Sequence, residues 1–317
     1  MKLIINLPAF NEEEKITETI QKIPRHFPSV DEVFIQVIDD GSRDKTVQAA
    51  KEAGADWVFS HPINRGIGIT FRTAVEKALE NGADIMVNMD ADGQFDAEDI
   101  IKLIRPIIEN RADLVSASRF GHKKADNMPK IKHFLNKTAA WIIGKFMQYP
   151  IADLTCGFRA YSRESLLRLN LSGGFTYTQE VIIDAIGKNL KIEWVPATVT
   201  YFENRQSRVV KNIFHYIGNS GKIILKTVRD VRPMRFFGIP SLILIIASLF
   251  FFVYFLLMYL ETLKITPYRN ILLLAVTLFL IGIQFLIFAF IADMIKTTRK
   301  SIEDQTYLIK KEKYDKH

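Results

Sequence analysis

Apolar and polar positions divide this chain of 317 residues into an alternating amino-terminal part and two long apolar segments near the carboxyl end. Short apolar runs in the first part predict strands at residues 3–7, 33–38, 57–59, 84–89, 113–117 and 192–195. Amphipathic stretches between them predict helices at residues 12–23, 45–52, 69–79 and 97–108. The alternation predicts an α/β fold, in which a mostly parallel sheet is covered by helices on both faces. The ligand crevice of such a fold lies at the carboxyl ends of the strands.

The two apolar segments, residues 236–260 and 271–292, are each long enough to cross a lipid bilayer. The first has no charged side chain, and the second has Gln284 as its one strongly polar residue. A helix rises about 1.5 Å per residue, so either segment covers the roughly 30 Å of bilayer hydrocarbon. We therefore expect two transmembrane helices that form a hairpin over residues 236–292, joined by the short connection 261–270.

Basic side chains flank this hairpin on both outer sides, whereas the connection carries only Lys264 and Arg269. The flanking bases are Arg229, Arg232, Arg235, Lys296, Arg299, Lys300, Lys310, Lys311 and Lys313. The positive-inside rule places both flanks in the cytoplasm. Because the amino terminus has no signal-peptide pattern, we expect an integral membrane protein with two spans, whose soluble domain and both termini are cytoplasmic.

The other domain boundaries follow from the same pattern of apolar and polar positions. Residues 1–210 form the predicted soluble domain, residues 211–235 a juxtamembrane amphipathic helix, and residues 293–317 a basic tail. Between residues 211 and 232 apolar positions recur at helical spacing with bases among the polar positions, which predicts a helix in the membrane interface. An ordinary amphipathic helix packed on the soluble domain is the alternative.

The composition limits the classes of partner. The formal net charge of +7 is compatible with nucleic acid, but the bases cluster beside the apolar segments and between residues 119 and 145. That placement suits anionic lipids and phosphates equally well, and we expect no nucleic-acid partner. The single cysteine, Cys156, excludes an intrachain disulfide and fits a small buried hydrophobic residue better than a nucleophile. The histidines lack metal-ligand spacing, so we expect no zinc; a homo-oligomer is left open.

Two carboxylates follow directly on the apolar run at residues 84–89, in the segment Asp90-Ala91-Asp92-Gly93-Gln94. The two-residue period of a strand directs Asp90 and Asp92 to the same side as the strand ends. Two such carboxylates, with the Gln94 carbonyl as a further oxygen ligand, suit Mg²⁺ or Mn²⁺ that holds a diphosphate. A solvated acidic turn formed by local capping is the alternative.

Polar turns also follow the first two predicted strands and lead into the next helices. They are Pro8-Ala9-Phe10-Asn11-Glu12-Glu13 and Asp39-Asp40-Gly41-Ser42-Arg43-Asp44-Lys45-Thr46. Free amides at helix starts contact nucleotides, and a buried carboxylate such as Asp39 suits a base imide or a ribose hydroxyl. Helix capping by Asn11, Asp40 or Ser42 is the alternative.

The segment from Asn64 to Arg72 matches a dinucleotide-binding fingerprint only weakly, because Phe71 stands where that pattern has its third glycine. Gly66 and Gly68 still permit the backbone to approach a ligand closely. Arg72 is long enough to reach a phosphate.

Taken in order, these segments resemble the family 2 inverting glycosyltransferases, whose nucleotide-sugar-binding fold is called GT-A. Within that family the chain is most similar to the polyprenyl-phosphate glycosyltransferases, of which dolichyl-phosphate mannose synthase is the familiar example. The matching segments are Pro8-Ala9-Phe10-Asn11-Glu12, Asp39-Asp40-Gly41-Ser42 with Asp44 and Thr46, Asn64 with Gly66 and Gly68, Asp90-Ala91-Asp92-Gly93-Gln94, Ser118-Arg119-Phe120, and Asp153-Leu154-Thr155-Cys156-Gly157-Phe158-Arg159.

The resemblance implies a nucleotide-sugar donor, a polyprenyl-phosphate acceptor and a divalent metal. It assigns metal binding to Asp90, Asp92 and Gln94, and acceptor-phosphate binding to Arg119. The nucleotide-sugar site that it implies comprises Pro8, Ala9, Phe10, Glu12, Asp39, Asn64, Gly66, Arg72, Asp90 and Ala91. The sequence departs from the family pattern at Phe10, at Asp96-Ala97 and at Asn204-Arg205-Gln206-Ser207-Arg208.

In an inverting transfer the acceptor oxygen attacks the anomeric carbon as the nucleoside diphosphate leaves, and a metal neutralises the charge on that leaving group. A lipid phosphate is already ionised near neutral pH, so positioning by basic side chains is sufficient. The candidates for this positioning are Arg119, Lys130, Lys132, Arg205 and Arg208. For Lys130 and Lys132 a solvated helix face is an equal alternative, and for Arg159 we expect a structural ion pair.

A hydroxyl acceptor needs a general base, for which Asp153 is the first candidate and Glu180 the second. Asp92, Arg119 and Asp153 are thus the catalytic candidates. We expect a membrane-anchored glycosyltransferase that transfers a sugar from UDP- or GDP-sugar to polyprenyl phosphate. Transfer to a hydroxyl of a lipid-linked or membrane saccharide is one alternative, and a non-catalytic membrane-anchored binding module is another.

Overall fold

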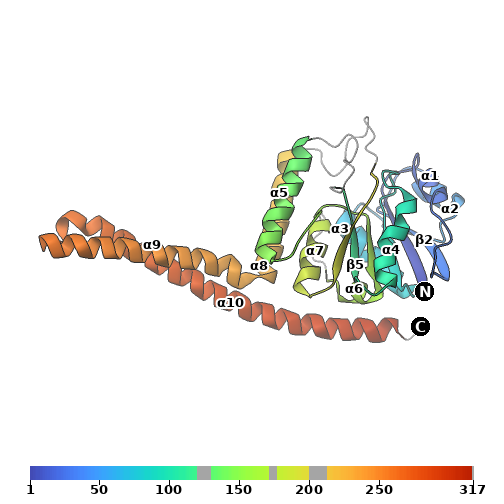
Figure 1. Ribbon diagram of the computed structural model, residues 1–317. Coiled ribbons are helices and arrows are strands. Elements are labelled where there is room, and N and C mark those ends of the chain that lie inside the picture. Colours follow the sequence, from blue (N-terminus) through green and yellow to red (C-terminus); the bar gives the residue numbers. More distant parts are fainter. Residues whose placement is uncertain (120–129, 171–176, 200–212, 316–317) are drawn as a thin grey trace. The chain divides into compact units, whose positions relative to one another are not determined.

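The structure is a computed structural model that describes residues 1–119, 130–170, 177–199 and 213–315 (Figure 1). It divides into two compact units. One comprises Met1–Leu225 together with Gln305–His317, and the other comprises Lys226–Asp304. The first unit contains the sheet and the second contains the apolar helices.

A sheet of seven strands forms the centre of the first unit, in the order β3-β2-β1-β4-β6-β5-β7. Its strands are β1 (Lys2–Ala9), β2 (Glu32–Asp39), β3 (Trp57–Ser60), β4 (Ile85–Asn88), β5 (Leu114–Ser118), β6 (Arg159–Ser162) and β7 (Ile192–Pro196). All neighbours are parallel except β6, which runs antiparallel to both β4 and β5. The predicted α/β class and mostly parallel sheet are confirmed, and each predicted strand is present.

The sequence pattern missed β6. This strand has only four residues, Arg-Ala-Tyr-Ser, and begins with a charged side chain, so it lacks the apolar run that marks the other strands. Arg159 is nevertheless 0% exposed. Main-chain carbonyls and a hydroxyl satisfy its guanidinium inside the domain, as described below.

Helices cover the sheet and continue to the carboxyl end. Their bounds are α1 (Ile16–Gln21), α2 (Thr46–Glu52), α3 (Ile67–Glu80), η1 (Ala97–Asp99), α4 (Ile100–Ile108), α5 (Lys130–Met147), α6 (Arg163–Arg168), α7 (Thr178–Gly187), α8 (Ile213–Val231), α9 (Pro233–Thr262), η2 (Thr266–Tyr268) and α10 (Arg269–Tyr314). The first helix begins at Ile16 rather than at Glu12 as predicted. Asn11 has a φ of 53°, and the Glu12 amide donates to Thr46 Oγ1 (2.8 Å), so this segment turns toward the next loop first.

The two faces of the sheet differ in polarity. Alternate residues of β1, from Leu3 to Leu7, belong to a buried apolar core that includes side chains of α1 and α4. Because side chains alternate along a strand, Asn6 points to the other face. There Gln36 Nε2 donates to the carbonyl of Ala74 in α3 (2.9 Å). The apolar face stabilises the domain, and the α3 face contains buried polar groups.

In the second unit α9 packs against α10 through small and hydroxyl-bearing residues. Ser241 Oγ donates to the Gly282 carbonyl (2.8 Å), and Ser248 Oγ donates to the Ala275 carbonyl (2.7 Å). Both helices are long and apolar enough to cross a membrane, and only 17% and 11% of their most apolar windows are buried. This low burial distinguishes them from the core helices of a soluble domain. The hairpin of two long apolar helices agrees with the sequence prediction.

The end of α10 belongs to the first unit. Tyr307 Oη donates to Glu164 in α6 (3.0 Å), and Lys310 Nζ donates to the Leu169 carbonyl (3.1 Å). The segment predicted as a basic tail is therefore helical as far as Tyr314, and its last turns contact the sheet domain. The amphipathic pattern at residues 211–232 corresponds to α8.

Candidate active site

The loops that follow β1 and β2 are joined by hydrogen bonds from main-chain amides of one loop to side chains of the other. The Asn11 amide donates to Ser42 Oγ (2.8 Å), and the Arg43 amide donates to Asn11 Oδ1 (2.9 Å). The Glu12 amide donates to Thr46 Oγ1 at the start of α2 (2.8 Å). Asn11 and Ser42 thus satisfy amides across the two loops rather than capping the helix of their own segment.

Two adjacent aspartates at the end of β2 have different roles. Asp39 is 2% exposed, and its oxygens accept from the Ser42 amide (3.2 and 3.3 Å). Asp40 accepts from the amides of Arg65 and Gly66 (2.9 and 2.8 Å) and contacts His61 Nδ1 (2.8 Å). Asp40 therefore binds the segment that opens α3 instead of its own helix α2, and it joins a third loop to the first two.

Gly41 makes the approach of these loops possible. It has a φ of +76°, and a Cβ placed on it would lie 2.6 Å from the carbonyl carbon of Ile63 and 2.8 Å from the amide nitrogen of Asn64. The position thus excludes a side chain for both conformational and steric reasons. Asn64 and Gly66, predicted nucleotide residues, lie in this third loop. Arg72 lies on α3 and is exposed.

The acidic motif begins two residues beyond the end of β4. Ala91 is 2% exposed, and its carbonyl accepts from Thr19 Oγ1 of α1 (3.2 Å). Asp92 Oδ1 accepts from the Gln94 amide (3.0 Å), which makes a local turn. Asp90 is half-buried beside Gly157, where a Cβ would lie 3.5 and 3.6 Å from its two carboxylate oxygens. The motif is therefore packed against α1 and the Gly157 segment, and is more than a solvated turn.

The donor set of this motif fits a metal that a substrate helps to bind. Within the described ranges no group of three or more His, Cys, Asp or Glu side chains could hold a metal ion. Mg²⁺ is commonly bound by one or two carboxylates, with substrate phosphates and waters as the other ligands. Asp90 and Asp92 meet this requirement. Gln94 stays a predicted ligand.

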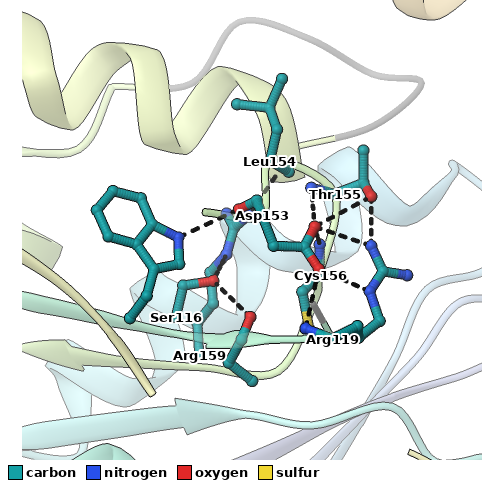
Figure 2. Close-up of polar contacts among 9 residues, drawn as sticks. Ser116, Arg119, Asp153, Leu154, Thr155, Cys156 and Arg159 are labelled. Carbon is teal, nitrogen blue, oxygen red and sulfur yellow. Dashed lines mark hydrogen bonds and ion pairs between the residues drawn. The ribbon is translucent and has the colours of Figure 1, made fainter. Parts of the chain in front are cut away.

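Arg119 and Asp153 form a buried ion pair, shown in Figure 2. Arg119 Nε donates to Asp153 Oδ2 (2.8 Å) and Nη2 donates to Oδ1 (2.9 Å), while Nη2 also donates to Thr155 Oγ1. Asp153 is 0% exposed and accepts further bonds from the amides of Thr155 (2.9 Å) and Cys156 (3.2 Å). Both carboxylate oxygens are thus occupied by donors within the domain.

The roles predicted for Arg119 in acceptor binding and for Asp153 as a base stay predictions, and this pairing bears on both. Burial by itself raises the pKa of Asp153, but the Arg119 charge, its hydrogen bonds and the neighbouring amides outweigh burial and lower the pKa below the usual value. A buried carboxylate with a lowered pKa, whose oxygens already accept several hydrogen bonds, is a poor general base. Nε and Nη2 of Arg119 both donate to Asp153, so the two side chains fix each other's orientation.

Two neighbours of this pair have structural roles. Arg159 donates to the carbonyls of Thr178 (2.7 Å) and Leu154 (3.1 Å) and to Ser116 Oγ (3.2 Å), as Figure 2 shows in part. Its structural role was expected, but carbonyls replace the expected carboxylate. Cys156 is 1% exposed, and burial raises its pKa to about 12, which makes it unreactive.

The remaining candidates differ in how far the structure describes them. Pro8 and Ala9 are buried at the end of β1, and Phe10 and Glu12 are half-buried in the loop that follows. Glu180, in the first turn of α7, is 6% exposed. For Lys130 and Lys132 only the helical backbone of α5 is described, and Phe120, Arg205 and Arg208 lie outside the described residues. The acceptor loop stays a prediction.

Sequence reasoning missed a set of buried polar residues below the acidic motif. Asn88 interrupts the apolar run of β4, and the two-residue period puts it on the same face as Asp90. Its Nδ2 donates to Tyr177 Oη (2.8 Å). An amide inside an otherwise apolar run was the available signal, because buried polar groups need partners.

The fold is an α/β domain with a mostly parallel sheet, a class in which ligands bind at the carboxyl ends of the strands, the edge where the acidic motif lies. Residues 4–169, more than half of the chain, match the model of the family "Glycosyl transferase family 2". The chain belongs to this family, and it is a glycosyltransferase.

Individual relatives agree with this assignment. The UDP-N-acetylglucosamine–dolichyl-phosphate N-acetylglucosaminyltransferase of Methanococcus voltae is 32% identical over 64% of this chain and 87% of that protein. The polyprenol monophosphomannose synthase of Mycolicibacterium smegmatis is 30% identical over 63% of this chain and 77% of that protein. A crystal structure of glucosyl-3-phosphoglycerate synthase from Mycobacterium tuberculosis, in complex with UDP, has a TM-score of 0.56 at 23% identity and covers 73% of this chain and 79% of that one. The last likeness confirms the GT-A fold.

We predict that Asp153→Asn destabilises the chain because it leaves the buried Arg119 charge without its counter-ion. The expected loss is about 3–5 kcal/mol. Since the pKa of Asp153 is lowered on folding, its carboxylate stabilises the fold above the unfolded pKa of about 3.9, and this contribution disappears as the pH falls through the folded pKa. Thermal unfolding of the full chain in detergent should therefore show a constant difference from wild type between pH 7 and 5.

The control is Glu193→Gln, which breaks a surface ion pair with Arg111 (2.5 Å) and should cost no more than about 1 kcal/mol. Equal unfolding midpoints for Asp153→Asn and wild type at pH 7 would contradict the buried pair. A difference that vanished by pH 6 would contradict the lowered pKa.

We predict that Gly41→Ala destabilises the loops more than Gly54→Ala does. Both glycines have positive φ, +76° and +94°, so each alanine costs about 1–2 kcal/mol in backbone strain. At Gly54 the nearest atom to a Cβ is 3.8 Å away, whereas at Gly41 the main chain of Ile63 blocks it. The overpacking adds about 1–3 kcal/mol at Gly41 alone, measurable by thermal unfolding. Equal thermal unfolding midpoints for the two variants would contradict the close contact between Gly41 and the main chain of Ile63.

Proposed function

We propose that the chain transfers a sugar, with inversion, from a UDP- or GDP-sugar to a polyprenyl phosphate at the cytoplasmic face of a membrane, and that the transfer depends on Mg²⁺ or Mn²⁺. The observation that carries the proposal is the packed acidic motif, Asp90 to Gln94, at the carboxyl edge of a family 2 domain whose chain continues into two exposed apolar helices. Residues 1–210, 211–235, 236–292 and 293–317 are the proposed domain, juxtamembrane, hairpin and tail segments.

The donor assignment rests on the three joined loops. They bring the end of β1, Asp39 and the start of α3 to one edge of the sheet, next to the strand that leads into Asp90. Main-chain amides and a buried carboxylate are the groups that bind a base and a ribose. The relative from Methanococcus voltae is named for a UDP-sugar donor.

Asp90 and Asp92, with Gln94, are the proposed ligands of the metal. When bound, the metal supplies the positive charge that stabilises the departing diphosphate. The chain's own contribution is to hold the two carboxylates in place. Ala91 is fixed to α1 by Thr19, and Asp90 lies against Gly157.

The acceptor assignment follows from the state of Asp153. A hydroxyl acceptor needs a base to remove its proton, but the Asp153 carboxylate is buried and paired with Arg119. An ionised phosphate attacks without that help. The names of both relatives, dolichyl-phosphate N-acetylglucosaminyltransferase and polyprenol monophosphomannose synthase, favour a lipid phosphate. Glu180 stays the candidate base for the hydroxyl alternative.

The membrane assignment rests on α9 and α10. Their apolar side chains lie outside any packed core, and a bilayer is the environment that buries them. The bases at both outer flanks support a cytoplasmic location for the soluble domain and both termini. A lipid acceptor would be present in the same membrane.

We predict that Asp92→Asn lowers metal-dependent transfer about 100-fold or more. The amide oxygen of asparagine can still accept from the Gln94 amide, so the turn persists while the charge is lost. The assay measures radiolabelled sugar transferred to membrane lipid from a panel of nucleotide sugars. Asp96→Asn is the control, since Asp96 caps η1 through the Glu98 amide (3.0 Å) and asparagine caps equally well.

The product distinguishes the alternatives. A sugar phosphodiester is labile to mild acid, whereas a glycoside of a hydroxyl is not comparably so. Release of the label by mild acid supports the lipid phosphate, and its retention supports the hydroxyl acceptor. If no nucleotide sugar supports transfer, the non-catalytic binding module is favoured. Full activity of Asp92→Asn would contradict the proposed metal ligands.

Single-cysteine labelling tests the proposed topology. Cys156 is buried with a pKa raised to about 12, so the wild-type chain should not react with a maleimide. In right-side-out vesicles an impermeant maleimide should label Lys264→Cys in the connection between α9 and α10, and should not label Lys300→Cys on α10. Both positions are exposed in the structure. The reverse labelling pattern would invert the topology, and labelling of both would exclude a membrane-spanning hairpin.

A further inference from the structure

A row of polar side chains crosses the sheet on the face that α3 covers. In the strand register Asn6 of β1 is the partner of Gln36 in β2 and of Asn88 in β4, and Asn88 is the partner of Arg159 in β6. All four side chains are 0% exposed. Four adjacent strands therefore place a buried polar residue at the same level, one step of the strand period before Asp90.

The three amides of this row are connected by hydrogen bonds in one direction. Gln36 Nε2 donates to Asn6 Oδ1 (3.0 Å), and Asn6 Nδ2 donates to Asn88 Oδ1 (2.6 Å). Asn88 Nδ2 then donates to Tyr177 Oη (2.8 Å) and to the Gly157 carbonyl (3.3 Å). The oxygens of Asn6 and Asn88 each accept from the previous residue, which gives these two amide groups a defined orientation, whereas the buried Gln36 oxygen has no hydrogen-bond partner among the described residues. The row ends at Tyr177.

Tyr177 is held on its ring as well as on its hydroxyl. It immediately precedes α7 and is 2% exposed. Its ring stacks on Phe71 of α3, with centroids 4.0 Å apart and an interplanar angle of 6°. The stack and the hydrogen bond from Asn88 together determine where the hydroxyl oxygen lies.

That hydroxyl and the Asp90 carboxylate have a common neighbour. A Cβ on Gly157 would lie 3.3 Å from Tyr177 Oη and 3.5 Å from Asp90 Oδ1. Both groups thus border the position that a side chain at residue 157 would occupy, and the Tyr177 hydroxyl also donates weakly to the Gly157 carbonyl (3.5 Å). A shift of the Tyr177 hydroxyl or of the Gly157 segment would therefore change the surface next to the Asp90 carboxylate.

Stability alone does not account for this arrangement. Replacing hydrogen-bonded buried partners by apolar groups of the same shape is close to neutral, and the apolar face of the same sheet shows that these strands pack well without amides. The row of amides adds a fixed orientation of the Tyr177 hydroxyl, at which the row ends. In metal sites, groups behind the ligands typically affect metal affinity about 10- to 100-fold.

We propose that Tyr177 is a positioning residue for Asp90: the amide row Gln36–Asn6–Asn88 fixes its hydroxyl against Gly157, and so holds the Asp90 carboxylate where it binds the metal. This role rests on the proposed function of Asp90 as a metal ligand. It extends the site beneath the acidic motif to a residue more than eighty positions later in the chain.

Tyr177→Phe and Tyr161→Phe are a matched pair that tests this role. Tyr161 is also fully buried, and its ring lies 5.4 Å from the same Phe71 ring. Its hydroxyl lies beside the Arg159 guanidinium, whereas the Asn88 amide donates to Tyr177 and to the Gly157 carbonyl. Each variant loses one buried hydroxyl and keeps its ring, but only Tyr177→Phe removes a partner of Asn88.

The experiment titrates the full chain in detergent with Mn²⁺, in the presence of UDP or of GDP, and measures free Mn²⁺ by its electron paramagnetic resonance signal. We expect Tyr177→Phe to weaken Mn²⁺ binding about 10-fold and Tyr161→Phe to leave it unchanged. Asp90→Asn is the reference and should abolish the nucleotide-dependent Mn²⁺ site. Thermal midpoints of all variants are measured in parallel.

The outcomes separate the two proposals. If Asp90→Asn binds Mn²⁺ as well as wild type does, the proposed metal site is wrong and the role of Tyr177 is overturned with it. If Asp90→Asn loses the site while Tyr177→Phe binds Mn²⁺ as tightly as Tyr161→Phe, the metal site stands and the positioning role alone is overturned. A lower thermal midpoint for Tyr177→Phe with unchanged Mn²⁺ affinity would mark a merely structural hydroxyl, and would also overturn the positioning role.

Discussion

The site depends on hydrogen bonds that join neighbouring loops to one another. Parallel strands deliver their carboxyl ends to one edge, where the main chain leaves the sheet and its amides lose their strand partners. Here side chains of neighbouring loops provide the missing acceptors, as when Ser42 accepts from the Asn11 amide and Asp40 accepts from the amides that open α3. Gly41 lets the backbones come close enough for this. A ligand at this edge therefore meets a surface whose shape three strands determine together.

The buried pair of Arg119 and Asp153 sets the chemistry that is open to this site. The sequence pattern suggested a base at Asp153, but its two oxygens already accept from Arg119 and from the amides of Thr155 and Cys156. With this carboxylate ionised and paired, an acceptor that brings its own charge has the advantage over one that must lose a proton. The pairing of Asp153 with Arg119 thereby supports the proposed lipid phosphate acceptor.

Much of the fold was predictable because most of its strands are short runs in which apolar residues predominate. The strands from β1 to β5 and β7 have such runs, and the acidic motif after β4 was recognisable from two carboxylates at a strand end. β6 was not predictable in this way, because its first residue is Arg159 and its partners, the Leu154 and Thr178 carbonyls, come from other segments. The pairing of Arg119 with Asp153 was hidden for the same reason. Sequence patterns report periodicity and local capping, whereas Arg119 pairs with a residue 34 positions away and Arg159 donates to residues 19 and 43 positions away as well as to Leu154.

The contrast between the two sheet faces explains how one domain can be both stable and accurately shaped. Apolar contacts on the α1 and α4 face are non-directional, so they favour burial without fixing any single orientation. Hydrogen bonds between amides are directional, and a buried amide that loses its partner costs free energy, so a row of them favours one arrangement over others. Asn88 shows why the two are combined here: it lies one strand period before Asp90, on the face away from the apolar core. A leucine at that position would pack, but it could not hydrogen-bond to Tyr177. It would therefore not fix the orientation of the groups beside the Asp90 carboxylate.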